Sequence, residues 1–210
     1  MVGLPPESAL DDVEGPPVFL EDFGKGLGPA WEPYGVIGGD WQAFAKVGPS
    51  RMAVRVPAGH SWGKTGIMSK DPFLTLDERP VRVQVELDPA ETTGVCVAFS
   101  QAKDYDIWRQ QNIWLTWAKS SDTEGGAFFG NTQNGGEQFG GFKTALPAPK
   151  TISVTFQPGQ AMLSLAGGKK AVQKFSWLKP GTKLYFTVFS HPASEYAAVD
   201  LTVKSIKVYK

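Results

Sequence analysis

The chain has 210 residues, of which 41% are hydrophobic and 20% are charged. Its 21 basic side chains balance its 21 acidic ones, so it lacks the net positive charge that marks nucleic-acid binding or attraction to an anionic membrane. No window approaches the run of about 18 apolar residues that inserts into a membrane. The composition predicts one globular domain, whose partner is expected to be neutral or to be recognised by local contacts.

The first 17 residues differ in composition from the rest. They combine four prolines with four acidic side chains, which predicts an acidic, proline-rich arm or linker over residues 1–17 and a folded domain over residues 18–210. Met1–Pro6 does not form a signal peptide. Because such an arm suits a module of a larger secreted protein, we expect an extracellular or periplasmic location.

From residue 18 onward, the chain alternates short apolar runs with turn residues, and no window keeps a helical period. Residues 81–87 alternate valine or leucine with polar side chains, which is typical of a half-buried strand, and residues 152–156 repeat the pattern. In 184–189 both faces are apolar, which predicts a strand covered on both sides. Cys96, the only cysteine, lies in another apolar run and is expected to be buried; no intrachain disulfide can form.

Turn signals separate these runs. Asn134-Gly135 between two aromatic runs predicts a hairpin, and Pro158-Gly159 and Pro180-Gly181 have the pattern of type II turns. A phase break near Lys204-Ser205 predicts a β-bulge. The spacing indicates roughly a dozen strands in an all-β sandwich or barrel. The glycines between 125 and 141 lack the lysine and hydroxyl residue of a phosphate loop, and hairpin flexibility explains them.

One segment concentrates tryptophan with polar side chains. On a strand over 112–118, Asn112, Trp114 and Thr116 share the face opposite the core, and a polar loop over 104–111 precedes it. Sugars bind to such surfaces, because their C–H faces stack on indole while their hydroxyls bond to polar groups. A second cluster surrounds Trp62. The predicted ligand-binding residues are Trp62, Trp108, Arg109, Gln110, Asn112 and Trp114.

Both ends of the domain carry a familiar combination: Phe19-Leu20-Glu21-Asp22-Phe23 with Trp31 near the start, and the strand 199–209, which holds Asp200 and ends in Val-Tyr. This resembles the concanavalin A-like lectin/glucanase superfamily, nearest to its carbohydrate-binding modules and its 3-keto-disaccharide hydrolase group. The resemblance implies a jelly roll of two antiparallel sheets, with both chain ends paired on one sheet. It also implies an oligosaccharide or polysaccharide as the partner.

Some members of this superfamily hold a structural calcium ion between the terminal strands. The resemblance therefore implies Glu21, Asp22 and Asp200 as calcium ligands, although these acids also fit solvated strand ends. No organic cofactor is expected.

An enzyme of this fold needs acidic and basic groups. The glucanase branch carries Glu-x-Asp-x-Glu, or the same motif with one more residue, and the chain lacks both; Glu86 belongs to the nearest fragment. The lyase branch uses residue types found here at His60, Tyr105 and Arg109. The sequence therefore favours a non-catalytic carbohydrate-binding domain. A glycoside hydrolase or polysaccharide lyase of the same fold and a laminin G-like protein-interaction module remain alternatives.

Overall fold

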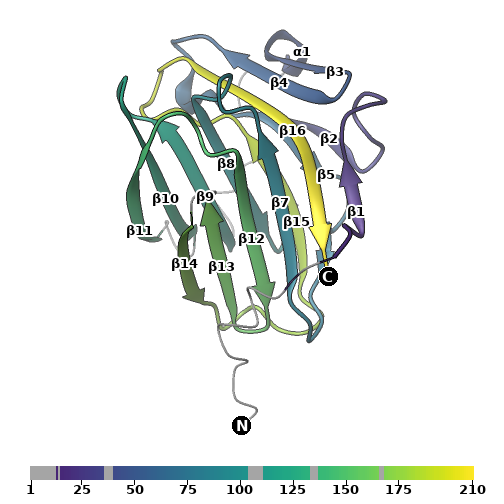
Figure 1. The fold of residues 1–210 in the computed structure, drawn as a ribbon. Coiled ribbons are helices and arrows are strands. Elements are labelled where there is room, and N and C mark those ends of the chain that lie inside the picture. Colours follow the sequence, from purple (N-terminus) through teal and green to yellow (C-terminus); the bar gives the residue numbers. More distant parts are fainter. Residues whose placement is uncertain (1–12, 14, 36–39, 104–110, 133–136, 166–167) are drawn as a thin grey trace.

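The computed structural model describes residues 13, 15–35, 40–103, 111–132, 137–165 and 168–210. These residues form sixteen strands, one four-residue helix, α1 (Trp41–Phe44), and one short 3-10 helix, η2 (Ser61–Gly63). The strands make two antiparallel sheets that pack face to face, as Figure 1 shows. Within the described part of the chain, no helix is long and apolar enough to cross a membrane. The two packed antiparallel sheets confirm the predicted all-β sandwich.

Sheet 1 has the order β14-β13-β12-β7-β16-β4-β3. Its long last strand, β16, pairs with β7 along one edge, and its other edge is shared by β4 and β1. Both ends of the domain thus meet on one sheet, as the resemblance implied. The strands of sheet 1 are β1 (Phe19–Glu21), β3 (Ala45–Gly48), β4 (Arg51–Val56), β7 (Val81–Leu87), β12 (Thr151–Gln157), β13 (Gln160–Leu165), β14 (Lys169–Lys174) and β16 (Val199–Tyr209).

Sheet 2 has the order β11-β10-β9-β8-β15-β5-β2, with β6 beside β15. Its strands are β2 (Trp31–Gly35), β5 (Thr65–Ser69), β6 (Leu74–Thr75), β8 (Gly94–Ser100), β9 (Asn112–Lys119), β10 (Glu124–Thr132), β11 (Glu137–Ala145) and β15 (Lys183–Phe189). The structure has more strands than the dozen predicted. The extra ones include β1 and β6, which are too short to show an alternating pattern.

The core lies between the sheets and is built from alternating side chains. Strand β7 buries every second residue, as predicted, and β15 is covered on both faces from Phe186 onward. A register shift between Val203 and Ser205 confirms the predicted bulge, which keeps the apolar residues on either side of it pointing inward. Ring contacts join the two sheets: the ring centroids of Phe99 on β8 and Phe156 on β12 lie 4.7 Å apart.

The outer face of sheet 2 is also largely buried. Strand β8 is buried along its whole length, and a second apolar cluster forms on this face from Tyr34, Met68, Cys96, Ala98 and Phe189, with Trp114 packed against it. We call this set the outer cluster. Burial raises the pKa of the Cys96 thiol to about 12, so the cysteine packs as an apolar side chain, in agreement with the prediction.

The turns behave largely as predicted. Gly159 and Gly181 have φ values of 86° and 85°, which type II turns require at their third position. Strands β10 and β11 form the predicted antiparallel hairpin, while Asn134-Gly135 lies outside the described residues. Of the predicted arm, residues 1–12 and 14 lie outside them too, and Val13 is buried.

Several glycines of the hairpin serve packing, a role that the sequence analysis did not predict. A Cβ added at Gly125 would lie 2.5 Å from the Trp117 ring, and one at Gly141 would lie 2.7 Å from Phe128. Gly140 takes the same role beneath Phe129. These glycines leave the space that the aromatic rings of the hairpin occupy.

Candidate functional site

The outer face of sheet 2 carries the predicted aromatic strand. On β9, Ile113, Leu115 and Trp117 point into the core, so the residues between them point outward, as predicted. Trp114 lies between Ala98 of β8 and Gly130 of β10, and these small neighbours leave room for the indole. Trp114 is half-buried against the outer cluster, whereas Asn112 and Thr116 are buried.

Trp62 reaches the same cluster from another direction. Its ring stacks on His191 at 5.1 Å, and His191 meets Phe189 of the outer cluster at 6.1 Å. Of the two half-buried tryptophans, Trp114 therefore packs directly on the outer cluster, and Trp62 is connected to it through His191.

A buried serine holds Trp62 and His191 together. The Ser190 hydroxyl donates a hydrogen bond to the Gly63 carbonyl and accepts one from the Thr65 N–H at 3.3 Å. Because Trp62 precedes Gly63 and His191 follows Ser190, these bonds hold the two rings side by side. The backbone of Trp62 has a φ of 56°, in the left-handed region that residues with bulky side chains adopt only rarely. Such constraint is a frequent feature of binding sites, because it fixes a side chain before the ligand arrives.

The environment of His191 keeps its ring neutral. Burial, followed by the neighbouring charge of Lys64, lowers the pKa of His191 to about 4, against an ordinary value of 6.5. A neutral ring stacks on indole without the cost of a buried charge.

This shift makes a prediction about stability. Because the unfolded chain binds a proton near pH 6.5 and the folded chain does not until about pH 4, stability is complete above pH 6.5 and is lost as the pH falls towards 4. Between pH 7 and pH 5, we expect the free energy of unfolding to drop by at most about 2 kcal/mol from this residue, since the ring is partly exposed. Urea unfolding of the wild type and of His191→Gln at both pH values measures it. An equal drop in both proteins would contradict the assignment.

The catalytic candidates have separate surroundings. Glu86 points outward from sheet 1 and accepts hydrogen bonds from Ser205 at 3.1 Å and Lys207 at 3.3 Å. Burial acts to raise the pKa of Glu86, but the bonds from Lys207 and Ser205 outweigh it and leave the pKa below its usual value. His60 packs edge-on against Phe44 at 5.0 Å. Four other predicted residues lie outside the described part of the chain, namely Tyr105, Trp108, Arg109 and Gln110.

The central strands of sheet 2 contain no carboxylates. Strands β5, β8, β9 and β15 have neither Asp nor Glu in their sequences. On the flanking strands, Glu32 binds Lys103 at 2.9 Å and Glu124 binds Lys143 at 3.2 Å. Retaining hydrolysis needs two carboxyl groups about 5 Å apart across the scissile bond, and these strands do not supply such a pair.

The structure does not bring together the three acids implied as calcium ligands. Glu21 pairs with Ile206 in the β1–β16 ladder, six residues along β16 from Asp200, which corresponds to about 20 Å. Glu21 accepts hydrogen bonds from the Phe23 N–H and the Trp31 indole, and Asp200 faces Arg55 at 3.6 Å. Among the described residues, no group of three potential ligands could hold a metal ion.

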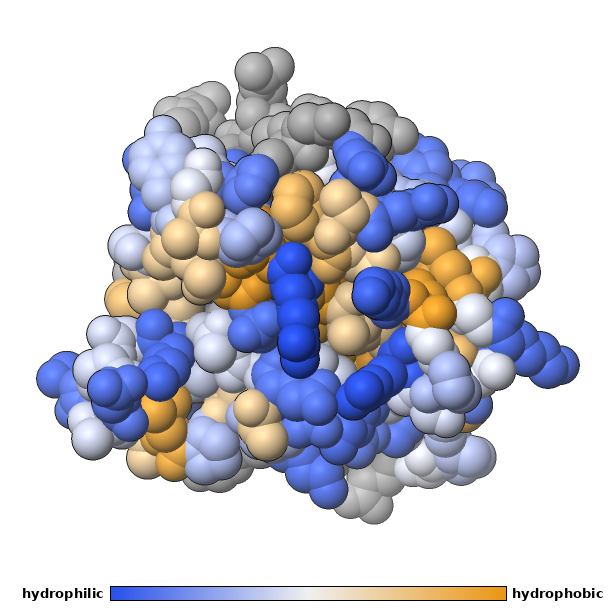
Figure 2. All heavy atoms as spheres, turned by 90° about the horizontal axis from the view of Figure 1, so that it is seen from above, coloured by the Kyte–Doolittle hydropathy of each residue, from blue (hydrophilic) through white to orange (hydrophobic). Residues whose placement is uncertain are grey.

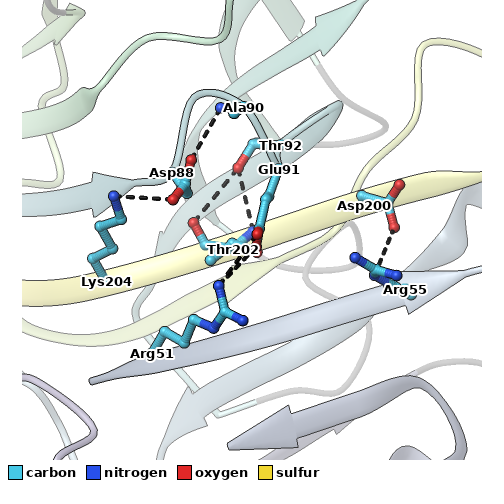
Figure 3. Close-up of polar contacts among 9 residues, drawn as sticks. All are labelled: Arg51, Arg55, Asp88, Ala90, Glu91, Thr92, Asp200, Thr202 and Lys204. Atoms are coloured by element: carbon cyan, nitrogen blue, oxygen red, sulfur yellow. Dashed lines mark hydrogen bonds and ion pairs between the residues drawn. The ribbon is translucent and has the colours of Figure 1, made fainter. Parts of the chain in front are cut away.

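The sequence reasoning missed a polar groove on the opposite sheet. Arg51 and Arg55 alternate with apolar residues on β4, and Glu91 and Asp200 reach them from other segments, while Lys204 pairs with Asp88 nearby, as Figure 3 shows. The alternation on β4 was visible in the sequence. That alternation gave no sign of the acidic partners, because Glu91 and Asp200 lie about 40 and 150 positions further along the chain than the arginines they contact.

The two sheets, their strand order and the pairing of both chain ends on sheet 1 define a concanavalin A-like jelly roll. Similar solved structures include a non-specific endo-β-1,3(4)-glucanase of family GH16 (TM-score 0.59, 10% identity, 92% of this chain and 90% of that chain). The β-glucanase of Bacillus licheniformis is similar as well (0.55, 13%, 93% and 98%). So is a legume lectin-like domain from Entamoeba histolytica (0.55, 10%, 86% and 90%).

At these identities, the similarity concerns the fold, which is shared by enzymes and a lectin-like domain. No family model matches the sequence, and no curated protein matches it either. Function therefore has to be argued from the side chains of the chain itself.

Proposed function

We propose that this protein is a non-catalytic carbohydrate-binding domain that holds an oligosaccharide or polysaccharide on the outer face of sheet 2. One observation carries the proposal: two half-buried tryptophans are connected to the outer cluster, Trp114 by direct packing and Trp62 through the ring of His191. The partly exposed indoles offer apolar faces for sugar C–H groups. The proposal keeps the extracellular or periplasmic location expected from the sequence.

The spacing of the strands supports a ligand of more than one sugar. Phe189 of β15, which supports Trp62 through His191, is separated from β9 by strand β8 alone. Two steps between strands span about 10 Å. Trp62 lies beyond Phe189 by the ring contacts through His191, so a ligand that contacts both Trp114 and Trp62 has to be longer than one sugar.

The alternative is a hydrolase of the same fold, since several similar structures are glycoside hydrolases. The lack of carboxylates on the four central strands of sheet 2 favours binding over hydrolysis. Laminari-oligosaccharides are a suitable first probe, because one similar structure, LamA_E269S from Z. galactanivorans, is in complex with laminaritriose and laminaritetraose.

Titration calorimetry, preceded by a glycan array, tests the proposal. Trp62→Ala and Trp114→Ala are each expected to weaken binding of the ligand found by roughly tenfold or more. Trp177→Ala is the matched control, because Trp177 is half-buried against Phe175 and the main core. It should leave the affinity unchanged.

Product analysis on the same samples separates the two functions. We expect no new reducing ends after long incubation with any oligosaccharide that binds. Cleavage products would overturn the non-catalytic assignment. Equal affinity in the wild type and both tryptophan variants would remove the outer face of sheet 2 as the binding surface.

A further inference from the structure

A groove of about 990 Å³ opens on the outer face of sheet 1, beside α1 and the β3–β4 hairpin. Figure 2 views the molecule from the end where these elements lie in Figure 1, and there hydrophilic side chains cross an apolar area. The groove is lined by Ala43, Phe44, Lys46, Gly48, Pro49, Ser50, Arg51, Ala53, Arg55, Glu91 and Lys204.

Strand register builds the floor of the groove. Lys46 of β3 pairs with Ala53 of β4, and Ala53 pairs with Thr202 of β16, so the three side chains form one outward row. Arg51 and Arg55 flank Ala53 on the same face of β4. The small Ala53 leaves a hollow between the two long arginine side chains.

Carboxylates hold the cations from the side, as Figure 3 shows. The Arg51 Nη1 donates to both Glu91 oxygens, at 3.3 and 3.0 Å, and Glu91 also accepts from Thr202 at 3.1 Å. The Arg55 Nε faces Asp200 at 3.6 Å, where an ion pair but no hydrogen bond forms. These contacts use one nitrogen of each guanidinium.

The charges of the groove are mixed, with a surplus of cations. The lining contains two lysines besides the two arginines. Lys204 forms an ion pair with Asp88 at 3.0 Å, and Lys46 has no ion-pair partner among the described residues. The four cations of the lining thus face Glu91 within it and two carboxylates, Asp88 and Asp200, at its margin. The arginine side chains are 50% and 79% exposed, so a ligand can reach them.

An apolar wall completes the groove. The Phe44 ring is half-buried, and it packs edge-on against His60 at 5.0 Å, which supports it. Together with Pro49 and Ala53, it gives the groove an apolar surface next to the guanidinium groups.

We propose that this groove binds an acidic oligosaccharide, that is, a sugar chain with carboxylate groups. A guanidinium fork matches a carboxylate with two parallel hydrogen bonds. The carboxylates of Glu91 and Asp200 accept hydrogen bonds from sugar hydroxyls, and the Phe44 ring packs on a sugar face. Each sugar of a uronate chain carries hydroxyl donors for the acids in and around the groove, whereas a DNA backbone carries none, so the mixed polar groups fit an acidic sugar better than DNA.

The inference is independent of the proposed function, because it concerns the other sheet. Calorimetry with an oligogalacturonate tests it, with laminari-oligosaccharide, inorganic sulfate and a single-stranded DNA oligonucleotide as comparison ligands. We expect the oligogalacturonate to bind, to bind more weakly as salt rises, and to bind more tightly than sulfate or DNA.

Variants locate the site. Arg55→Gln and Phe44→Ala are each expected to lower the affinity for oligogalacturonate by roughly tenfold. Arg79→Gln removes one exposed arginine elsewhere and should change nothing. Arg55 is the preferred arginine, because its single distant contact with Asp200 makes its loss harmless to folding.

Three outcomes would overturn the proposal. The first is no binding of oligogalacturonate to a folded protein, and the second is equal affinity in the wild type and both groove variants. The third is binding of sulfate or DNA as tight as that of the uronate, which would make the groove a general anion site. Trp114→Ala, which lies on the other sheet, should leave oligogalacturonate binding intact, so this test and that of the proposed function fail independently.

Discussion

Replacing Phe186 with alanine is expected to lower the free energy of unfolding by about 4 kcal/mol. The side chain is fully buried on β15, and its ring lies 5.0 Å from Phe99, 5.2 Å from Phe73 and 5.8 Å from Trp31. Because Phe99 in turn contacts Phe156 of sheet 1, removal of the ring leaves a cavity in the aromatic path that joins the two sheets. Urea unfolding followed by tryptophan fluorescence measures the change.

Two controls make the result specific. Phe186→Leu keeps most of the volume and should cost about 1 kcal/mol. Phe128→Ala removes the same ring type from a strand position that is 44% exposed, and it should cost less than about 1 kcal/mol. If Phe128→Ala proved as costly as Phe186→Ala, the core would not be centred where the structure places it.

Gly125→Ala is expected to cost about 3 kcal/mol. The added methyl group would lie 2.5 Å from the Trp117 ring, which is fully buried and donates its indole N–H to Thr144 at 2.7 Å. The indole crosses beneath Gly125 from β9 to reach β11, so it can yield only by losing this hydrogen bond. Overpacking costs about 1–3 kcal/mol, and the lost bond adds about 1 kcal/mol.

Gly48→Ala is the matched control for this variant. Gly48 lies in β3, and an added Cβ there would meet nothing within 4 Å. The free energy of unfolding should therefore change by less than about 0.5 kcal/mol, because alanine also restricts the unfolded chain. A cost for Gly125→Ala as small as that of Gly48→Ala would show that the hairpin adjusts without strain.

The two proposed binding surfaces lie on opposite faces of one scaffold. One uses aromatic side chains on the outer face of sheet 2, and the other uses charged side chains on the outer face of sheet 1. A jelly roll provides both faces with a rigid backbone, while the outward residues set the chemistry. The fold is shared with glucanases and a lectin-like domain, so the outward side chains of β9 and β4 carry the functional argument.

The sequence by itself determined the features that depend on neighbouring residues. The alternation in β7 and β12, the bulge at Ser205 and the Pro-Gly turns are all encoded within a few positions, because strand periodicity and turn geometry are local properties. The resemblance of the chain ends added the superfamily fold. Strand periodicity, which is local, also predicted correctly that Trp117 lies on the inward face of β9.

Only the tertiary structure decided which distant residues meet. It separated Glu21 from Asp200 through the register of β1 on β16, and it joined Arg51 to Glu91 and Arg55 to Asp200 across sheet 1. It also placed the outward side chains of β8 in one cluster with side chains from β2, β5 and β15. Strand pairing between segments far apart in the chain sets these neighbours, and no local pattern specifies it.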